Sequence, residues 1–156
     1  MTNEAYMHLA IEKALEGVAD EQSPFGAIIV QDGAVISGEH NSVVRDCDPT
    51  AHAEVNAIRR AANQLRTIAL RGCVMYTTCE PCPMCLSAIH WAKIDRVVYG
   101  ASIADATAAG FSELMVPARD LARLGRSTLI VEDGVLTEEC RRLFEVWRQG
   151  PWAKAY

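Results

Sequence analysis

The chain lacks long hydrophobic runs, although half of its 156 residues are hydrophobic. No apolar stretch approaches the roughly 20 residues that a membrane-spanning helix needs. The N-terminal segment carries Glu4 and Glu12 and lacks the charged-then-apolar pattern of a secretory signal. We therefore expect a cytoplasmic protein that does not act at a membrane.

Basic runs are missing too, since the formal net charge is −5 and the arginine pairs are isolated. Such a charge attracts no polyanion at long range, so we expect a small-molecule partner and no nucleic acid. The sequence has no repeats, linkers or low-complexity stretches. At this length, one domain over residues 1–156 can bury roughly 68–70% of its unfolded surface.

The sequence is also unlike that of a disulfide-stabilised domain. Such domains are small and loop-rich, whereas this chain can form a large apolar core. Six cysteines are nevertheless present, and reduced thiols with a metal account for them better than disulfides do. The six are Cys47, Cys73, Cys79, Cys82, Cys85 and Cys140.

Hydrophobic periodicity predicts an alternation of helices and strands. The expected helices span 3–18, 52–62, 82–92, 116–124 and 137–148, and the expected strands span 25–31, 34–37, 73–77, 96–101 and 128–131. Residues 104–110 are small and are expected to form a loop, and Asp32-Gly33 predicts a hairpin turn. An opening hairpin followed by β-α-β-α-β predicts an α/β domain with a mixed sheet and right-handed crossovers.

Two motifs carry the chemistry: His52-Ala53-Glu54, and downstream Pro81-Cys82-Pro83-Met84-Cys85. Together they supply one imidazole, two thiolates and one further carboxylate. Three protein ligands leave the fourth position of tetrahedral Zn²⁺ open, as in catalytic sites. Zinc lowers the pKa of bound water to about 7, so the pattern predicts hydrolytic chemistry.

The cysteine spacing favours this open site. Pro83 suits a first helical position, which places Cys82 near the N-cap. Cys82 and Cys85 are three residues apart and share a helix face, where the helix N-terminus stabilises thiolates. Cys79 ends an apolar run and is expected to be a small buried side chain. A redox dithiol, or a closed zinc site that includes Cys79, remains the alternative.

His52 and Glu54 are two residues apart, and such residues do not face each other along a helix. Both can serve one site only if the helix approaches it with its first turn. Asp48-Pro49-Thr50 offers an N-cap and a proline start for that helix. We therefore expect two helix N-termini to converge on one metal.

These residues resemble the zinc-dependent deaminases of the cytidine deaminase superfamily, a pattern that is a standard example of such enzymes. The longer stretches that carry the likeness, most similar to bacterial guanine deaminases, are Pro24-Phe25-Gly26-Ala27, Asp48-Pro49-Thr50-Ala51-His52-Ala53-Glu54 and Thr78-Cys79-Glu80-Pro81-Cys82-Pro83-Met84-Cys85.

The resemblance implies a three-layer α/β/α domain with a central mixed five-stranded sheet, often dimeric. It implies that His52, Cys82 and Cys85 bind Zn²⁺ and that Glu54 carries protons from water to a ring nitrogen and to the leaving amine. The implied reaction converts guanine to xanthine and ammonia. A tRNA-specific adenosine deaminase, a deaminase of guanosine, cytosine or an aminotriazine, and a non-catalytic zinc module remain open.

Substrate-binding residues are predicted at several further positions. Phe25 and Trp91 are candidates to sandwich a flat ring, although core packing would also explain either. Trp91 follows Cys85 by six residues on the metal helix, so we expect its indole near the site. Asn41 offers an amide donor and acceptor for a base edge, or serves a turn. Ala53, between the two motif residues, is also expected at the substrate.

Glu113 is the candidate for reading the base. Guanine deaminases of this type carry an acidic residue in the corresponding loop, more commonly Asp than Glu. A carboxylate only accepts hydrogen bonds, which favours N–H donors on a guanine-like ring. Asp105 is a rival for this role, and a solvated loop charge is the plain alternative.

The C-terminal tail, residues 150–156, ends in an aromatic side chain, which is unusually apolar for a frayed terminus. In the guanine deaminase type this segment closes the active site. We therefore expect Tyr156 to cover the pocket, either of its own chain or, by tail exchange in a homodimer, of a partner subunit.

Overall fold

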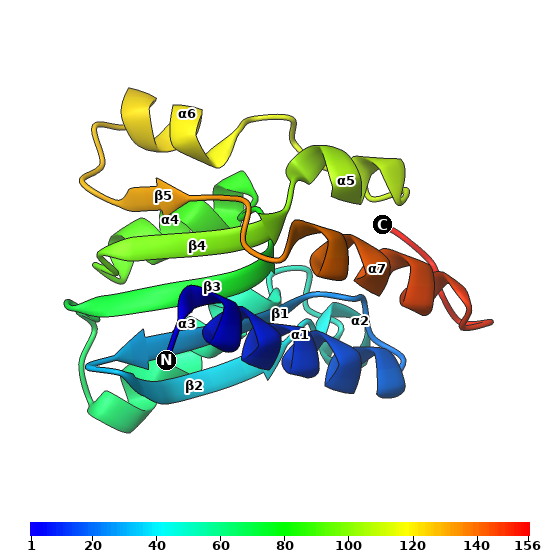
Figure 1. Ribbon diagram of the computed structural model, residues 1–156, viewed down its shortest axis with the longest axis horizontal. Helices are drawn as coiled ribbons and strands as arrows, with labels where there is room; N and C mark the ends of the chain where they lie inside the picture. Colours follow the sequence, from blue (N-terminus) through cyan, green and yellow to red (C-terminus); the bar gives the residue numbers. More distant parts are fainter.

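The computed structural model describes all residues from 1 to 156 (Figure 1). The helices are α1 (Asn3–Ala19), α2 (Val43–Asp46), α3 (Ala53–Leu65), α4 (Pro83–Trp91), α5 (Ile103–Ala108), α6 (Ala118–Leu124) and α7 (Thr137–Arg148). The strands are β1 (Gly26–Gln31), β2 (Ala34–His40), β3 (Cys73–Cys79), β4 (Arg96–Ala101) and β5 (Ile130–Glu132).

The strands form the expected mixed five-stranded sheet, and their order in it is β2-β1-β3-β4-β5. β1 pairs antiparallel with β2 and with β3, whereas β3, β4 and β5 are parallel to one another. Asp32 and Gly33 connect β1 to β2 with φ values of 51° and 81°. Two consecutive positive φ angles are those of a type I′ hairpin turn, so the predicted turn is confirmed.

Helices cover both faces of the sheet (Figure 1). Along β1, Ala27 and Ile29 belong to one apolar cluster, formed with α3, α4 and α6, while Ile28 and Val30 belong to the other, formed with α1, α5 and α7. This alternation follows from the two-residue side-chain period of a strand. The three-layer α/β/α domain is therefore confirmed.

One expected loop is a helix. The chain from Ile103 to Ala108 forms α5, because Ser102 and Asp105 make a capping box at its start. The Asp105 backbone N–H donates to Ser102 Oγ at 3.1 Å, and Asp105 Oδ2 accepts the Ser102 backbone N–H at 2.8 Å. The alanine content that suggested a flexible loop instead favours a helix, since alanine has the highest helix propensity.

Candidate active site

Three metal-ligating side chains meet at the C-terminal end of β3, where the N-termini of α3 and α4 converge. His52 is the N-cap of α3, Cys82 is the N-cap of α4, and Cys85 lies in the first turn of α4. His52 Nδ1 lies 3.4 Å from Cys85 Sγ and 3.7 Å from Cys82 Sγ. The predicted ligands therefore form one group, with all ligand atoms within 4.8 Å of one another.

This donor set fits zinc. With Zn–S and Zn–N bonds of about 2.3 and 2.0 Å, a nitrogen and a sulfur ligand of a tetrahedral ion lie roughly 3.6 Å apart. The two N···S distances of 3.4 and 3.7 Å bracket that value. Three ligands leave one tetrahedral position free, which is the arrangement of catalytic zinc sites.

Zinc would bind the thiolate forms of Cys82 and Cys85 and would displace any remaining thiol proton. The hydrogen bond with Cys85, together with His52, lowers the pKa of Cys82 to about 4. The same hydrogen bond and burial raise the pKa of Cys85 well above its ordinary value. Burial also raises the pKa of Cys79, whose thiol donates to the carbonyl of Ser102 at 3.5 Å, so Cys79 is the expected buried side chain outside the ligand group.

Glu54 lies beside the ligand group and is only 6% exposed. Its Oε1 accepts a hydrogen bond from Thr77 Oγ1 at 3.3 Å, and its Oε2 accepts one from the Cys85 thiol at 3.5 Å. Burial raises the pKa of Glu54. A carboxyl group in this environment can take up and release a proton closer to neutral pH than an exposed one.

The predicted start of α3 at Asp48-Pro49-Thr50 is wrong. Instead, Asp48 Oδ1 accepts the backbone N–H and the hydroxyl of Thr50, at 2.8 and 2.7 Å, in an Asx turn, and Pro49 lies on the cavity wall. The helix begins only after His52. His52 at the N-cap and Glu54 in the first turn both reach the site, so the prediction of an end-on helix is confirmed.

A cavity of about 200 Å³ opens beside the ligand group. Its wall combines metal-ligating, acidic and aromatic side chains from segments far apart in the sequence. The lining residues are Phe25, Pro49, His52, Glu54, Cys79, Glu80, Cys82, Phe111, Ser112, Glu113 and Tyr156.

Glu113 and its rival Asp105 have different environments. Glu113 lines the cavity, makes no hydrogen bond or ion pair within the chain, and has its pKa raised by burial. Asp105 lies outside the cavity wall, and both of its carboxylate oxygens accept hydrogen bonds from other residues of the fold. It caps α5 through Ser102 and accepts from Arg141 Nε at 3.0 Å. Of the two acids, only Glu113 faces the cavity.

The C-terminal tail lies over the cavity of its own chain. The Tyr156 carbonyl accepts the backbone N–H of Ser112 at 2.9 Å, and the Tyr156 hydroxyl accepts from Asn41 Nδ2 at 2.9 Å. Asn41 is 1% exposed and also takes up its turn role, since its Oδ1 accepts the Val43 N–H at 3.1 Å. Asn41 thus lies behind Tyr156 and is not itself part of the cavity wall.

The expected aromatic sandwich is only half formed within the chain. Phe25 lines the cavity and packs edge-on against Phe111, with ring centroids 5.0 Å apart. Trp91 is 75% exposed and lies outside the cavity wall. A residue six positions after Cys85 is rotated by about 120° from it around the helix axis, so the expectation that the indole lies near the site is wrong for a single chain. Ala53 is fully buried and also absent from the wall.

Sequence reasoning missed Phe111 and Glu80 on the wall. Phe111 also packs against Tyr156, with centroids 5.6 Å apart, which joins the tail to the aromatic wall. The sequence signal that could have indicated Phe111 is a single phenylalanine between Gly110 and polar residues. Glu80 lies between Cys79 and Pro81 in the cysteine motif, and the spacing of the metal ligands does not distinguish it.

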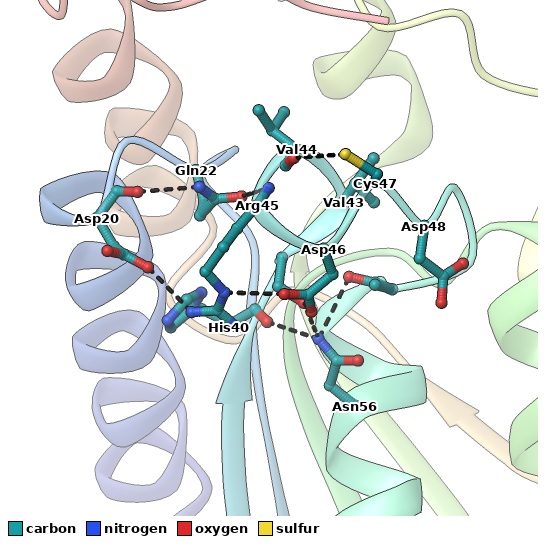
Figure 2. Close-up of polar contacts among 12 residues, drawn as sticks. Asp20, Gln22, His40, Val43, Val44, Arg45, Asp46, Cys47, Asp48 and Asn56 are labelled. Atoms are coloured by element: carbon teal, nitrogen blue, oxygen red, sulfur yellow. Dashed lines mark hydrogen bonds and ion pairs between the residues drawn. The ribbon is translucent and has the colours of Figure 1, made fainter.

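A polar network holds the connection from β2 to α3, which carries Asn41 and His52 (Figure 2). Arg45 of α2 pairs with Asp20 at 3.0 Å and with Asp46 at 3.0 Å. Asn56 Nδ2 donates to the carbonyl of His40 at 3.0 Å and also to Ser42 Oγ. Figure 2 shows these side chains directed toward one another between α1, α2 and α3, so both ends of the connection are tied to helices.

Comparison with known proteins agrees with this geometry. A family model described as the cytidine and deoxycytidylate deaminase zinc-binding region matches residues 1–101. Guanine deaminase of Bacillus subtilis is 42% identical over 157 residues, which cover all of both chains. tRNA-specific adenosine deaminase of Aquifex aeolicus is 43% identical over 65% of this chain and 67% of its own. The solved structure of guanine deaminase from Nitrosomonas europaea superposes with a TM-score of 0.87 at 28% identity, over 94% of this chain and 85% of that chain.

Proposed function

The chain belongs to the cytidine and deoxycytidylate deaminase family with its zinc-binding region, and we propose that it hydrolyses guanine to xanthine and ammonia. The family makes it a zinc-dependent hydrolytic deaminase that cleaves a cyclic amidine C–N bond. Guanine is supported by 42% identity to a guanine deaminase over the whole chain, whereas a tRNA-specific adenosine deaminase that matches 94% of this chain is 36% identical to it.

Glu113 is the observation that carries the choice of guanine. Its carboxylate faces the cavity without a partner in the chain and has only acceptor atoms. Glu113 is half-buried, and a ligand that covers its carboxylate has to donate hydrogen bonds to it, because burying an unpaired carboxylate is costly. Guanine presents ring N–H and amino donors, whereas the pairing edge of adenine also presents an acceptor, which a carboxylate would repel.

In the proposed reaction, His52, Cys82 and Cys85 would hold zinc, which would supply hydroxide at neutral pH. Glu54 takes a proton from the attacking water and delivers it to the ring nitrogen next to the carbon that carries the amino group, while the water oxygen bonds to that carbon. Glu54 then takes the proton of the new hydroxyl group and passes it to the amino group, and the C–N bond breaks to release ammonia as the carbonyl forms. Phe25 and Phe111, which pack edge-on against each other, form one apolar side of the cavity beside the ring, and Tyr156 excludes water, which strengthens each electrostatic contact inside.

A substrate panel tests this assignment. Ammonia release should be measured with guanine, guanosine, adenine, cytosine, an aminotriazine and a tRNA anticodon stem-loop. We expect kcat/KM for guanine to exceed that for every other compound. Faster turnover of the tRNA stem-loop would establish the adenosine deaminase alternative, which the tail over the cavity and the net charge of −5 oppose.

We also propose that the chain forms a homodimer through the outer faces of α3 and α4. Ile68 is 90% exposed and Trp91 is 75% exposed, and both line one open groove beside these helices. Exposed apolar surface of this kind typically marks a protein interface.

None of the helices has the length and apolar character that a membrane span requires. All six cysteines are unpaired, which supports a reducing compartment such as the cytoplasm.

Sedimentation velocity at micromolar concentration tests the dimer, and a monomer would refute it. Mixing two inactive variants then tests tail exchange. Glu54→Ala subunits would supply tails, and subunits truncated after residue 151 would supply intact catalytic groups. Restored activity means that the tail closes the partner's cavity, whereas no restoration means that each tail serves its own chain.

A further inference from the structure

Glu80 bridges the N-termini of two helices. Its Oε2 accepts the backbone N–H of Ile103, the first residue of α5, at 3.0 Å, and its Oε1 accepts that of Ala118, the first residue of α6, at 2.8 Å. The side chain is 9% exposed. A buried carboxylate that accepts two backbone N–H groups at helix N-termini makes two charge-assisted hydrogen bonds aligned with the helix dipoles.

Neither N–H has another side-chain partner. Ser102, the N-cap of α5, accepts from Asp105 N instead of Ile103 N. Pro117, the N-cap of α6, has no polar side chain and makes no capping bond. The first N–H groups of a helix have no intrahelical partner, so these two donors depend on Glu80.

The segment between the two anchors, residues 103–118, carries the part of the cavity wall that would contact the base. Phe111, Ser112 and Glu113 line the cavity, and the backbone N–H of Ser112 holds the carbonyl of Tyr156. Glu80 itself lies two residues before Cys82, on the turn that leads into the metal ligands. Glu80 thus ties both ends of residues 103–118, the wall segment, to the turn that precedes Cys82.

We propose that Glu80 is a positioning residue that sets the distance between the metal group and Glu113, and that it thereby determines how well the cavity selects its substrate. This inference rests on the proposed guanine deaminase function. We assign Glu80 to the wall segment and not to the base because it is 9% exposed and each of its oxygens accepts a backbone N–H group of that segment.

Glu80→Gln tests the proposal, since the amide leaves one acceptor and turns a donor toward the second N–H. We expect an unchanged zinc content and a KM for guanine raised about tenfold, equivalent to about 1.4 kcal/mol, with a smaller change in kcat. In a Glu113→Ala background the same change should raise KM less than twofold. Asp120→Asn is the matched control, because Asp120 also lies in the first turn of α6 but does not contact Ala118 N, and it should leave KM unchanged.

Additive effects of Glu80→Gln and Glu113→Ala on KM would overturn the proposal, as would loss of zinc from Glu80→Gln. If the wild type does not release ammonia from guanine, the proposed function fails instead. Amide hydrogen exchange of the wild type then tests the bridge without activity and without any variant. The N–H groups of Ile103 and Ala118 should be protected, and exchange at the rate of free first-turn amides would refute the bridge.

Discussion

Glu54→Gln replaces the proposed proton carrier by an amide of nearly the same shape. The Gln oxygen can still accept from Thr77 Oγ1, which lies 3.3 Å from Glu54 Oε1, and the three metal ligands are untouched. We therefore expect the variant to fold and to retain one zinc per chain. It can no longer accept a proton or deliver one to the ring.

The magnitude follows from the burial of the site. Positioned acid–base catalysis contributes about 10²–10⁴-fold to a rate. At 1.36 kcal/mol per factor of ten, this range corresponds to about 2.7–5.4 kcal/mol of activation free energy. Because Glu54 is only 6% exposed, bulk water has poor access to replace it, so we expect a loss near the upper end, about 10⁴-fold in kcat.

The assay measures ammonia release and zinc content on the same sample, with a thermal melt to confirm folding. Glu145→Gln, a change at an exposed position of α7, is the control and should behave as the wild type. A variant that keeps kcat within tenfold would show that Glu54 carries no essential proton. Loss of zinc together with activity would make Glu54 a ligand and overturn the assigned role.

Four further predictions concern the cavity wall and the backbone at two glycines. Glu113→Gln should raise KM for guanine about tenfold and narrow the preference for guanine over adenine, and steady-state kinetics with both bases would show this. Deletion of residues 152–156 should lower kcat/KM without loss of zinc, and an unchanged kcat/KM would refute the closing role of the tail. Gly26→Ala should lower the free energy of unfolding by about 3 kcal/mol, because the added Cβ would clash with the backbone carbonyl of Ala10. Gly134→Ala, with nothing within 4 Å but a φ of +82°, should cost only about 1 kcal/mol in the same denaturation assay.

The fold and the metal group could be predicted from the sequence because both depend on local signals. Alternating apolar residues place Ile28 and Ile29 on opposite faces of the sheet, and Pro83 places Cys82 at a helix start. The two-residue offset of Glu54 from His52 already required an end-on helix. Two local predictions were wrong: Asp48 caps a turn and not the helix, and the expected loop at residues 104–110 contains helix α5.

The substrate wall could not be predicted in the same way, since it depends on contacts between distant segments. Tyr156 meets Asn41 across 115 residues. Glu80 reaches Ala118 across 38 residues. No spacing rule connects such pairs. The prediction for Trp91 was wrong for a different reason, because two residues that are close along a helix need not lie on the same face. The Trp91 indole is exposed and lies outside the cavity wall of its own chain.

The most direct test of the central claim is product identification with guanine as the only substrate. Zinc-loaded protein should convert guanine to xanthine with one ammonia released per xanthine, as measured by chromatography and an independent ammonia assay. Removal of zinc by a chelator should abolish the conversion, and added zinc should restore it. Absence of xanthine from the zinc-loaded, folded protein would contradict the assignment of guanine as substrate.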